Sequence, residues 1–502
     1  MPTTSISSMS APNPSAPGAD TANPAAAPWE SVLRYAPRYL EFQRAFGRQP
    51  GFQVAVAVDG APLGSFSGGF ADLGDRTPMT DRHLFRVASH SKSFTATAVM
   101  QLVEDKALRL DDELSAHLPE LAGSDLAEAT VGELLSHSAG VVRDGADSDF
   151  WSLARPFPDR AELVDMARAG RVVERNERFK YTNVGYGLLG LVIEAVTGRG
   201  YHEHLRSRVL EPLGLADTGP ELDARAAELA SGYASLAAGG EPYGLGQRVP
   251  IDHIDTGALA AATGFYSTAT DMVRFFSAHL PSAPLPSAHR PAAQGGGVTG
   301  ALLSEAGKRR MRRRVEESGI PGRAYGLGLI LEEVHGAATL GHSGGYPGHS
   351  TRTWAVPDTG VVLSVLTNAV DGPAAAWGEA LFALAGLAAR DAPASYAGAS
   401  AEELRRFEGR FSGLWGTQDI VELGGKLFAI PLVGGLDPEH LVPLERVDGT
   451  TLRSVDPNGF GGYGETLRFE FDDAGAAAVR GPAGMRSVRH GDFRLPGRVS
   501  LP

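Results

Sequence analysis

The sequence contains no cysteine, and this absence excludes a whole class of chemistry. None of the 502 residues can act as a thiol nucleophile, form a disulfide or ligate a metal through a cysteine thiolate. Long apolar runs are also missing, since no stretch of about 18 consecutive apolar residues predicts a membrane span. The first basic residue is Arg34, and no apolar segment before it has the composition of an export signal. From the sequence we therefore expect a cytoplasmic protein.

Positive charge is scarce as well. The formal net charge is −13 at pH 7, and lysine occurs at only five positions, 92, 106, 180, 308 and 426. This acidic balance argues against a partner that is a nucleic acid or an anionic membrane. We expect a small molecule or a short peptide as substrate, and the sequence allows a homo-oligomer. His202 and His204 are close in sequence, but no third ligand accompanies them, so we expect neither a metal nor a cofactor.

The order of the predicted elements divides the chain into three parts. Residues 1–28 are rich in Ser, Pro, Ala and Thr and predict a disordered tail. Residues 29–392 predict one α+β domain, in which strands near both ends form a mostly antiparallel sheet flanked by helices, with a helical lobe inserted between them. Residues 400–502 predict a small, barrel-like all-β domain. The strands predicted for the sheet are 52–58, 63–70, 325–334, 338–342, 351–356 and 361–367, and a helix over 374–389 follows them.

The chain is organised around Ser89-x-x-Lys92. An apolar, strand-like entry over 84–88 leads into a helical segment, which we predict to begin at Ser89. Residues i and i+3 of a helix are neighbours, so the Lys92 amine would lie beside the Ser89 hydroxyl. A partly desolvated lysine can serve as the base that activates a serine. With serine at roughly 7% of residues, five lysines give about 0.3 chance matches, so the pattern needs partners elsewhere in the chain.

The first candidate partner is Tyr181-x-Asn183, which precedes an apolar helix over 184–197. A phenol beside a cation is expected to lose its proton more readily and to shuttle it. Asn183 can hydrogen-bond both the lysine and a substrate carbonyl. His137 is a further candidate base, but it lies near the end of an apolar helix that Gly140 is predicted to terminate, and we assign it a structural role.

The second candidate partner is the run His342-Ser343-Gly344-Gly345 at the end of a predicted strand. Glycines there let a substrate approach the backbone closely, and the N–H groups of Gly345 and Ser89 can form an oxyanion hole. The same run matches the G-x-S-x-G pattern of a nucleophile elbow with Ser343 as nucleophile. That arrangement needs a helix directly after the serine, whereas further strands follow here, so we do not favour it.

The three motifs, in this order, resemble those of the serine β-lactamase-like hydrolases, in particular the branch of class C β-lactamases, DD-peptidases, D-aminopeptidases and esterases. The resemblance covers residues 48–390, and its segments are 84–96, 134–140, 181–190 and 341–345. It implies that Ser89 is acylated, that Lys92 and Tyr181 handle protons, and that Asn183, His342, Ser343, Gly344 and Gly345 bind substrate. The C-terminal region resembles the lipocalin-like β-barrel domains of some of these enzymes.

One departure from the family pattern bears on the substrate. His342 occupies the place of the lysine in the β-lactamase Lys-Thr-Gly motif, which replaces a permanent cation with a group expected to titrate near neutrality. Activity should then change between about pH 5 and 8, and esters or uncharged amides are favoured over β-lactams. The prediction is a serine hydrolase of a small ester, amide or short peptide, including one with D-residues. The alternatives are a β-lactamase, an acyltransferase on the same scaffold, and a non-catalytic penicillin-binding-like protein.

Overall fold

The structure is a computed structural model, and it describes residues 23–238, 248–281, 302–433, 436, 441–456, 462–481 and 484–494. These residues form two units. The first is Gly47–Gly378, and the second joins the residues up to Phe46 with those from Glu379 onward. The predicted division at residues 392–400 lies beyond this boundary, which falls inside helix α12 (Ala374–Ala389).

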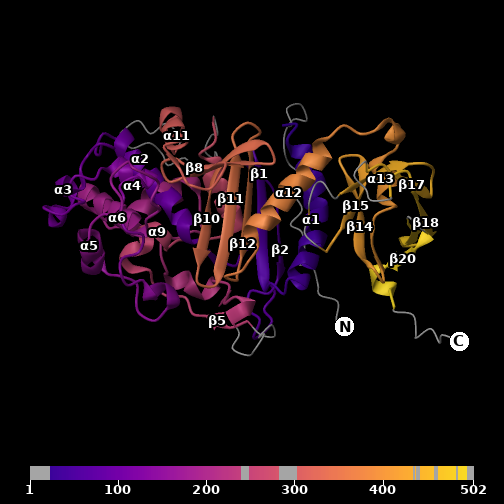
Figure 1. Cartoon of the computed structure of the whole chain (residues 1–502), viewed down its shortest axis with the longest axis horizontal. Helices are drawn as coiled ribbons and strands as arrows, with labels where there is room; N and C mark the ends of the chain where they lie inside the picture. The colour runs from indigo at the N-terminus through magenta and orange to yellow at the C-terminus, as the bar shows by residue number, and fades with distance from the viewer. Residues whose placement is uncertain are drawn as a thin grey trace. The chain divides into compact units, whose positions relative to one another are not determined.

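A single antiparallel sheet forms the centre of the first unit (Figure 1). Its strand order is β2-β1-β12-β11-β10-β9-β8-β7, so strands from the two ends of the unit lie side by side at β1 and β12. Val54 of β1 is opposite Val365 of β12. This confirms the predicted sheet. The strands are β1 (Gly51–Val58), β2 (Ala61–Gly69), β7 (Glu316–Glu317), β8 (Arg323–Tyr325), β9 (Ile330–Val334), β10 (Ala337–Tyr346), β11 (His349–Val356) and β12 (Val361–Thr367).

Two turns in this sheet show what the sequence could and could not predict. Asp59 and Gly60 join β1 to β2 with φ values of 50° and 78°, as expected for a two-residue hairpin turn that needs left-handed backbone. The strand predicted over 325–334 is instead two strands, β8 and β9. Gly328 between them has φ 73°, and a Cβ there would lie only 2.3 Å from the Cβ of Ala96, so the chain turns tightly against a helix.

Helix α10 covers one face of the sheet in the first unit, and the other helices gather in a lobe. Helix α10 packs on β1, β11 and β12, while α2 packs on α6 and α9, beside α4, in the helical lobe (Figure 1). Thr182 caps the N-terminus of α6 by accepting a hydrogen bond from Gly185 N, and Gly198 ends the helix with φ 64°. The helices are α2 (Ser91–Glu104), α3 (Leu114–His117), α4 (Val131–Ser136), α5 (Arg160–Arg168), α6 (Asn183–Thr197), α7 (Tyr201–Leu205), α8 (Glu211–Leu213), α9 (Ala260–Thr263), α10 (Ala269–Ser277) and α11 (Glu305–Met311).

Two predicted helix boundaries are wrong, and both errors lie close to the predicted site. The α-helix does not begin at Ser89: a 3-10 turn over Ala88–His90 comes first, and α2 starts at Ser91. Helix α4 does not continue to Gly140, because His137 adopts the left-handed conformation (φ 63°) directly after Ser136. Residues other than glycine rarely adopt a positive φ, so the histidine at position 137 did not indicate that the helix ends there.

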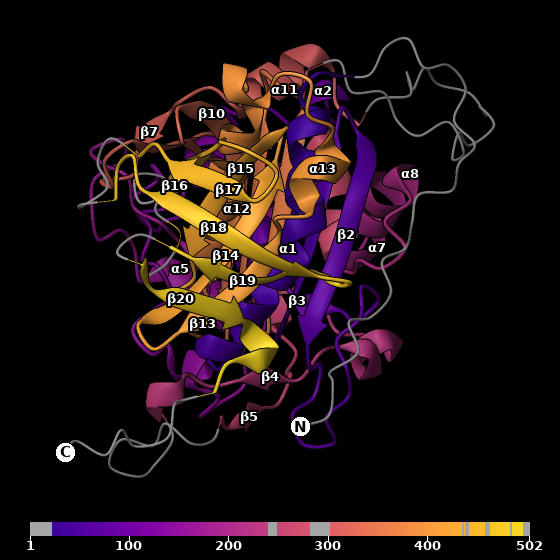
Figure 2. The same cartoon turned by 90° about the vertical axis from the view of Figure 1, so that its right-hand side faces the viewer.

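The second unit contains helix α1 (Ala26–Phe46) and a closed barrel, drawn from orange to yellow in Figure 2. This confirms the predicted barrel. Helix α1 belongs to this unit, although its residues were predicted to open the hydrolase domain, because Tyr35 donates a hydrogen bond to the buried Asp419 on β14. The barrel strands are β13 (Gly409–Gly413), β14 (Gly416–Leu423), β15 (Lys426–Pro431), β16 (Val442–Arg446), β17 (Thr451–Ser454), β18 (Thr466–Asp472), β19 (Gly475–Arg480) and β20 (Arg486–Arg489).

The tail predicted over 1–28 is only partly described. Helix α1 already begins at Ala26, inside the predicted tail, and residues 1–22 lie outside the described part of the chain. Among the described helices, none combines the length and the apolar character needed to cross a bilayer.

Candidate active site

Ser89 lies in a short strained segment that exposes its hydroxyl. Strand β3 (Phe85–Arg86) pairs with β6 (Tyr266–Ser267), and the 3-10 turn follows directly. Ala88 has φ 48°, a left-handed conformation that costs energy for a residue with a Cβ. Ala88 and His90 are fully buried, while Ser89 between them is only half-buried. The turn therefore presents one side chain out of an otherwise buried segment.

Lys92 is fully buried, and its amine is held by three oxygen atoms. Nζ lies 3.2 Å from Ser89 Oγ, 2.7 Å from Asn183 Oδ1 and 2.9 Å from the carbonyl oxygen of Ala262. Burial holds the pKa of Lys92 well below its ordinary value, although the Asp144 carboxylate opposes this effect. A neutral amine has two N–H donors and one lone pair. In that neutral state the amide and carbonyl oxygens, which can only accept, would take both N–H groups and leave the lone pair facing the Ser89 hydroxyl.

Tyr181 is a hydrogen-bond donor to the same serine. Its hydroxyl donates to Ser89 Oγ over 2.8 Å, and Lys92 Nζ lies 4.7 Å from the centre of its ring. The expectation that this phenol loses its proton more readily is wrong. Burial raises the pKa of Tyr181, and this effect outweighs the hydrogen bond with Ser89 and the cation of Arg143, which lower it. Tyr181 therefore keeps its proton and acts as a donor to Ser89.

His342 lies on β10 with its ring almost fully buried. Nδ1 is 2.7 Å from the carbonyl oxygen of Ser343, which can only accept, so Nδ1 carries the proton. Nε2 then accepts from the hydroxyl of Tyr325 at 2.9 Å. The expectation that His342 titrates near neutrality is wrong, because burial lowers its pKa well below the ordinary range. His342 is a neutral, doubly hydrogen-bonded imidazole and supplies no cation.

The glycines after His342 allow β10 to pass close to the nucleophile. A Cβ on Gly344 would lie 2.2 Å from the carbonyl oxygen of Val87, two residues before Ser89. Gly345 is exposed, and nothing lies within 4 Å of the position where its Cβ would be. Ser343 is half-buried in mid-strand, and a strand rather than a helix comes next, which does not fit a nucleophile elbow. The roles of Ser343, Gly344 and Gly345 toward substrate stay predictions.

The comparisons with known proteins agree with this arrangement. A family model described as "Beta-lactamase" matches residues 40–387. The chain belongs to the Beta-lactamase family. It is 31% identical over 329 residues to "Penicillin-binding protein 4" of Amycolatopsis lactamdurans, a match that covers 64% of this chain and 81% of that protein.

Two groups of solved structures extend the likeness. A structure of SurE is 28% identical, covers 93% of this chain and 100% of its own, and superposes with a TM-score of 0.58. The D-amino acid amidase of Ochrobactrum anthropi SV3, in complex with D-phenylalanine, is 27% identical, covers 67% of this chain and 92% of its own, and has a TM-score of 0.54. Within the Beta-lactamase family, the present chain is a serine hydrolase enzyme.

His137, to which the sequence assigns a structural role, lies beside Tyr181 and Lys92 in the structure. Its ring packs at a tilt against that of Tyr181 with 4.4 Å between ring centres, and its Nδ1 accepts a hydrogen bond from Thr182 N at 3.2 Å. Its own pKa is lowered well below the ordinary value by burial and by the nearby Lys92. The neutral ring thereby holds the segment that carries Tyr181.

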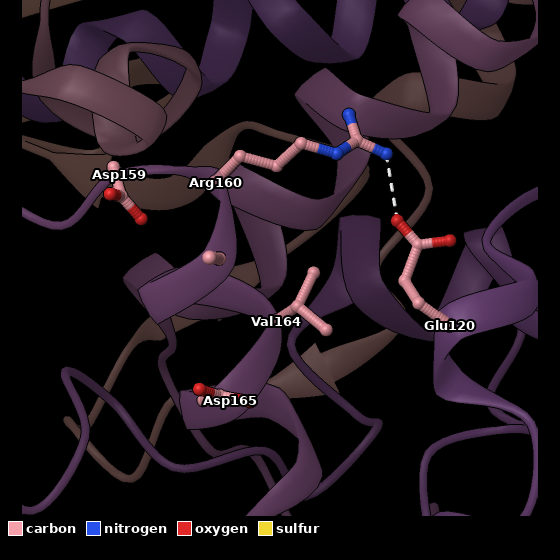
Figure 3. A pocket seen from close by; sticks show the side chains of 6 residues that line it. Glu120, Asp159, Arg160, Val164 and Asp165 are labelled. Carbon is pink, nitrogen blue, oxygen red and sulfur yellow. Dashed lines mark hydrogen bonds and ion pairs between the residues drawn. The ribbon is translucent and has the colours of Figure 1, made fainter.

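A hollow away from the nucleophile is lined by the first turns of α5 and by Glu120 (Figure 3). Arg160 lies across it and donates to Glu120 over 2.7 Å, and Asp159 and Asp165 are at its edge. Neither Ser89 nor Lys92 lines it. This hollow is therefore separate from the candidate active site.

The neutral form assigned to His342 can be tested by NMR titration. Because its pKa is lowered in the folded protein, its NMR signals, assigned by comparison with a His342→Gln variant, should not move between pH 8 and 5. In the urea-unfolded chain the same residue should titrate at about 6.5. The unfolded chain therefore binds more protons below about pH 6.5, so His342 makes folding less favourable as the pH falls. A midpoint near neutrality in the folded protein would contradict this assignment.

Proposed function

We propose that this enzyme cleaves a small ester, amide or short peptide through an acyl-enzyme on Ser89, and that it prefers an acyl group with a D-residue. The observation that supports the proposal is that the side chains of Tyr181 and Lys92 both contact the hydroxyl oxygen of Ser89. Ser89 Oγ receives the hydroxyl of Tyr181 at 2.8 Å and faces the Nζ of Lys92 at 3.2 Å. A serine becomes a nucleophile when a base lies within this distance.

The reaction follows from these contacts. Ser89 Oγ attacks the substrate carbonyl carbon while its proton moves to the lone pair of Lys92, and the tetrahedral oxyanion is received by the N–H groups of Ser89 and Gly345. Protonated Lys92 then gives the proton to the leaving oxygen or nitrogen, and the acyl-enzyme forms. In the second half of the reaction, water attacks the acyl carbonyl carbon while Lys92 takes a proton from it. Lys92 then returns this proton to Ser89 Oγ as the acid is released. Asn183 and the β10 residues His342, Ser343 and Gly344 position the substrate and the lysine.

The preference for D-residues rests on the relatives. A structure of SurE was determined with D-Leu, and the amidase with D-phenylalanine, and both proteins are more than 25% identical to this chain. A β-lactam substrate is less well supported, because β10 offers the neutral His342 in the position of a lysine cation. We therefore propose D-aminoacyl esters and amides as the preferred substrates.

The proposal is tested with the purified enzyme and matched pairs of D- and L-leucine and D- and L-phenylalanine amides and methyl esters. We expect kcat/KM for the D-form to exceed that for the L-form by at least about 10-fold, the discrimination that one well-shaped pocket provides. With an added amine acceptor, an ester and an amide of the same acyl group should give the same product ratio, because they share one acyl-enzyme. Faster turnover of the L-forms, or of nitrocefin than of either pair, would contradict the substrate class.

A further inference from the structure

Asp144 is a buried carboxylate that lies behind the reacting groups and belongs to none of the three motifs. It follows α4 in a loop, and its side chain is 11% exposed. Asn183 Nδ2 donates to Asp144 Oδ1 over 2.6 Å, and Arg143 Nε lies 3.0 Å from Oδ2. The loop is fastened to the start of α6, because Asn183 N donates to the carbonyl oxygen of Arg143 at 2.9 Å.

We propose that Asp144 is a positioning residue for the reaction. Its carboxylate fixes the side-chain amide of Asn183 in the one orientation that keeps the lone pair of Lys92 free to accept the proton of the Ser89 hydroxyl. The inference rests on the proposed function, since it assumes Lys92 as the base.

The argument is a count of donors and acceptors. An ionised carboxylate accepts only, so the Asn183 group facing it must be the NH2. The amide oxygen then faces Lys92, where it takes one N–H of the amine. If the amide were reversed, its NH2 would face Lys92 and compete with the Ser89 hydroxyl for the only lone pair. Without a charged acceptor at position 144, only the N–H groups of Lys92 would favour this orientation of the amide.

Asp144 also acts on Lys92 through its charge. The charged or titratable groups that face Lys92 are Asp144, Arg143, Tyr181, Tyr186, His137 and His342. The two tyrosines keep their protons and both histidines are neutral. The carboxylate of Asp144 raises the pKa of Lys92, and the cation of Arg143 lowers it. Removal of either charge should therefore move the pH dependence of the reaction, and in opposite directions.

The test is the rate of Ser89 labelling by a fluorophosphonate, which needs no knowledge of the substrate, measured from pH 5 to 10 on the full-length enzyme. Asp144→Asn should lower the plateau rate by about 10- to 100-fold, part of the roughly 10²–10⁴-fold that general-base catalysis contributes. It should also move the acid limb of the profile to lower pH. Asp144→Glu, which keeps the carboxylate, should recover part of the plateau rate.

Arg143→Gln is the matched variant, because the Arg143 side chain is 64% exposed and its loss should not affect folding. It should move the acid limb to higher pH. A purely structural role for Asp144 would reduce the plateau rate and leave the limb in place, and that result overturns the inference, as does a plateau within twofold of the wild type. If Asp144→Asn does not fold, an unmoved limb in Arg143→Gln overturns it. Failure to label Ser89 in the wild type would overturn the proposed function itself, and this inference with it.

Discussion

Replacing Ser89 by alanine is expected to lower kcat/KM by about 10⁴-fold or more, because loss of a nucleophile removes the covalent route entirely. Lys92 and Tyr181 would remain in place, but the atom on which both converge would be gone. The measurement is the turnover of an activated p-nitrophenyl ester, with D-aminoacyl amides as the slower substrates. Folding of the variant is checked by its thermal unfolding.

Ser93→Ala is the control for this prediction. Ser93 lies four residues further along the chain, within α2, is fully buried where Ser89 is half-buried, and donates its hydroxyl to the carbonyl oxygen of Gly328 at 2.7 Å. Its replacement should cost about 1–3 kcal/mol of stability through the unsatisfied carbonyl, with turnover close to that of the wild type. Ester turnover in Ser89→Ala at the level of Ser93→Ala would remove Ser89 from the mechanism.

Replacing Arg86 by alanine is expected to reduce the free energy of unfolding by about 3–5 kcal/mol, because it leaves a buried charge without its partner. The guanidinium of Arg86 is fully buried and donates to Glu221 Oε1 at 2.8 Å. It also donates to the carbonyl oxygens of Gly264 and Ile254, and it lies 4.5 Å from the centre of the Tyr346 ring. Urea denaturation followed by circular dichroism measures the loss.

Two further variants separate this effect from the loss of a long side chain. The double variant Arg86→Met with Glu221→Leu should be more stable than Arg86→Ala, since neither charge is then left unpaired. Arg109→Ala removes a bidentate pair with Asp111 on the surface, and its unfolding curve should match that of the wild type. A loss in Arg86→Ala no larger than in Arg109→Ala would show that the buried pair adds nothing.

Much of the site could be predicted because its chemistry resides in short motifs. Ser89 and Lys92 are three residues apart, and Tyr181 and Asn183 are both at the start of α6, so local spacing already brings each pair together. The sheet was predictable for a similar reason. Alternating and apolar runs with turn residues between them mark β1, β2, β11 and β12, whatever their neighbours in space.

What could not be predicted depends on burial and on contacts between distant segments. A histidine is expected to titrate near neutrality, but burial lowers the pKa of His342 and keeps the ring neutral, although its hydrogen bond to the Ser343 carbonyl opposes this effect. The same holds for Tyr181, whose burial outweighs the nearby cation. Asp144 carries no sequence signal, because its importance arises only when the loop that holds it meets α6. Helix α1 likewise belongs with the barrel through a contact to Asp419 that spacing does not reveal.

The central claim is that Ser89 carries the acyl group, and the most direct measurement is the mass of the modified protein. The wild type and Ser89→Ala are incubated with a fluorophosphonate and, separately, with an activated D-leucyl ester, quenched in acid, and analysed as intact protein and as peptides. The account predicts one adduct per chain on the peptide that contains Ser89 in the wild type, and none in Ser89→Ala. An adduct that persists in Ser89→Ala, or one located on Ser343, would contradict it.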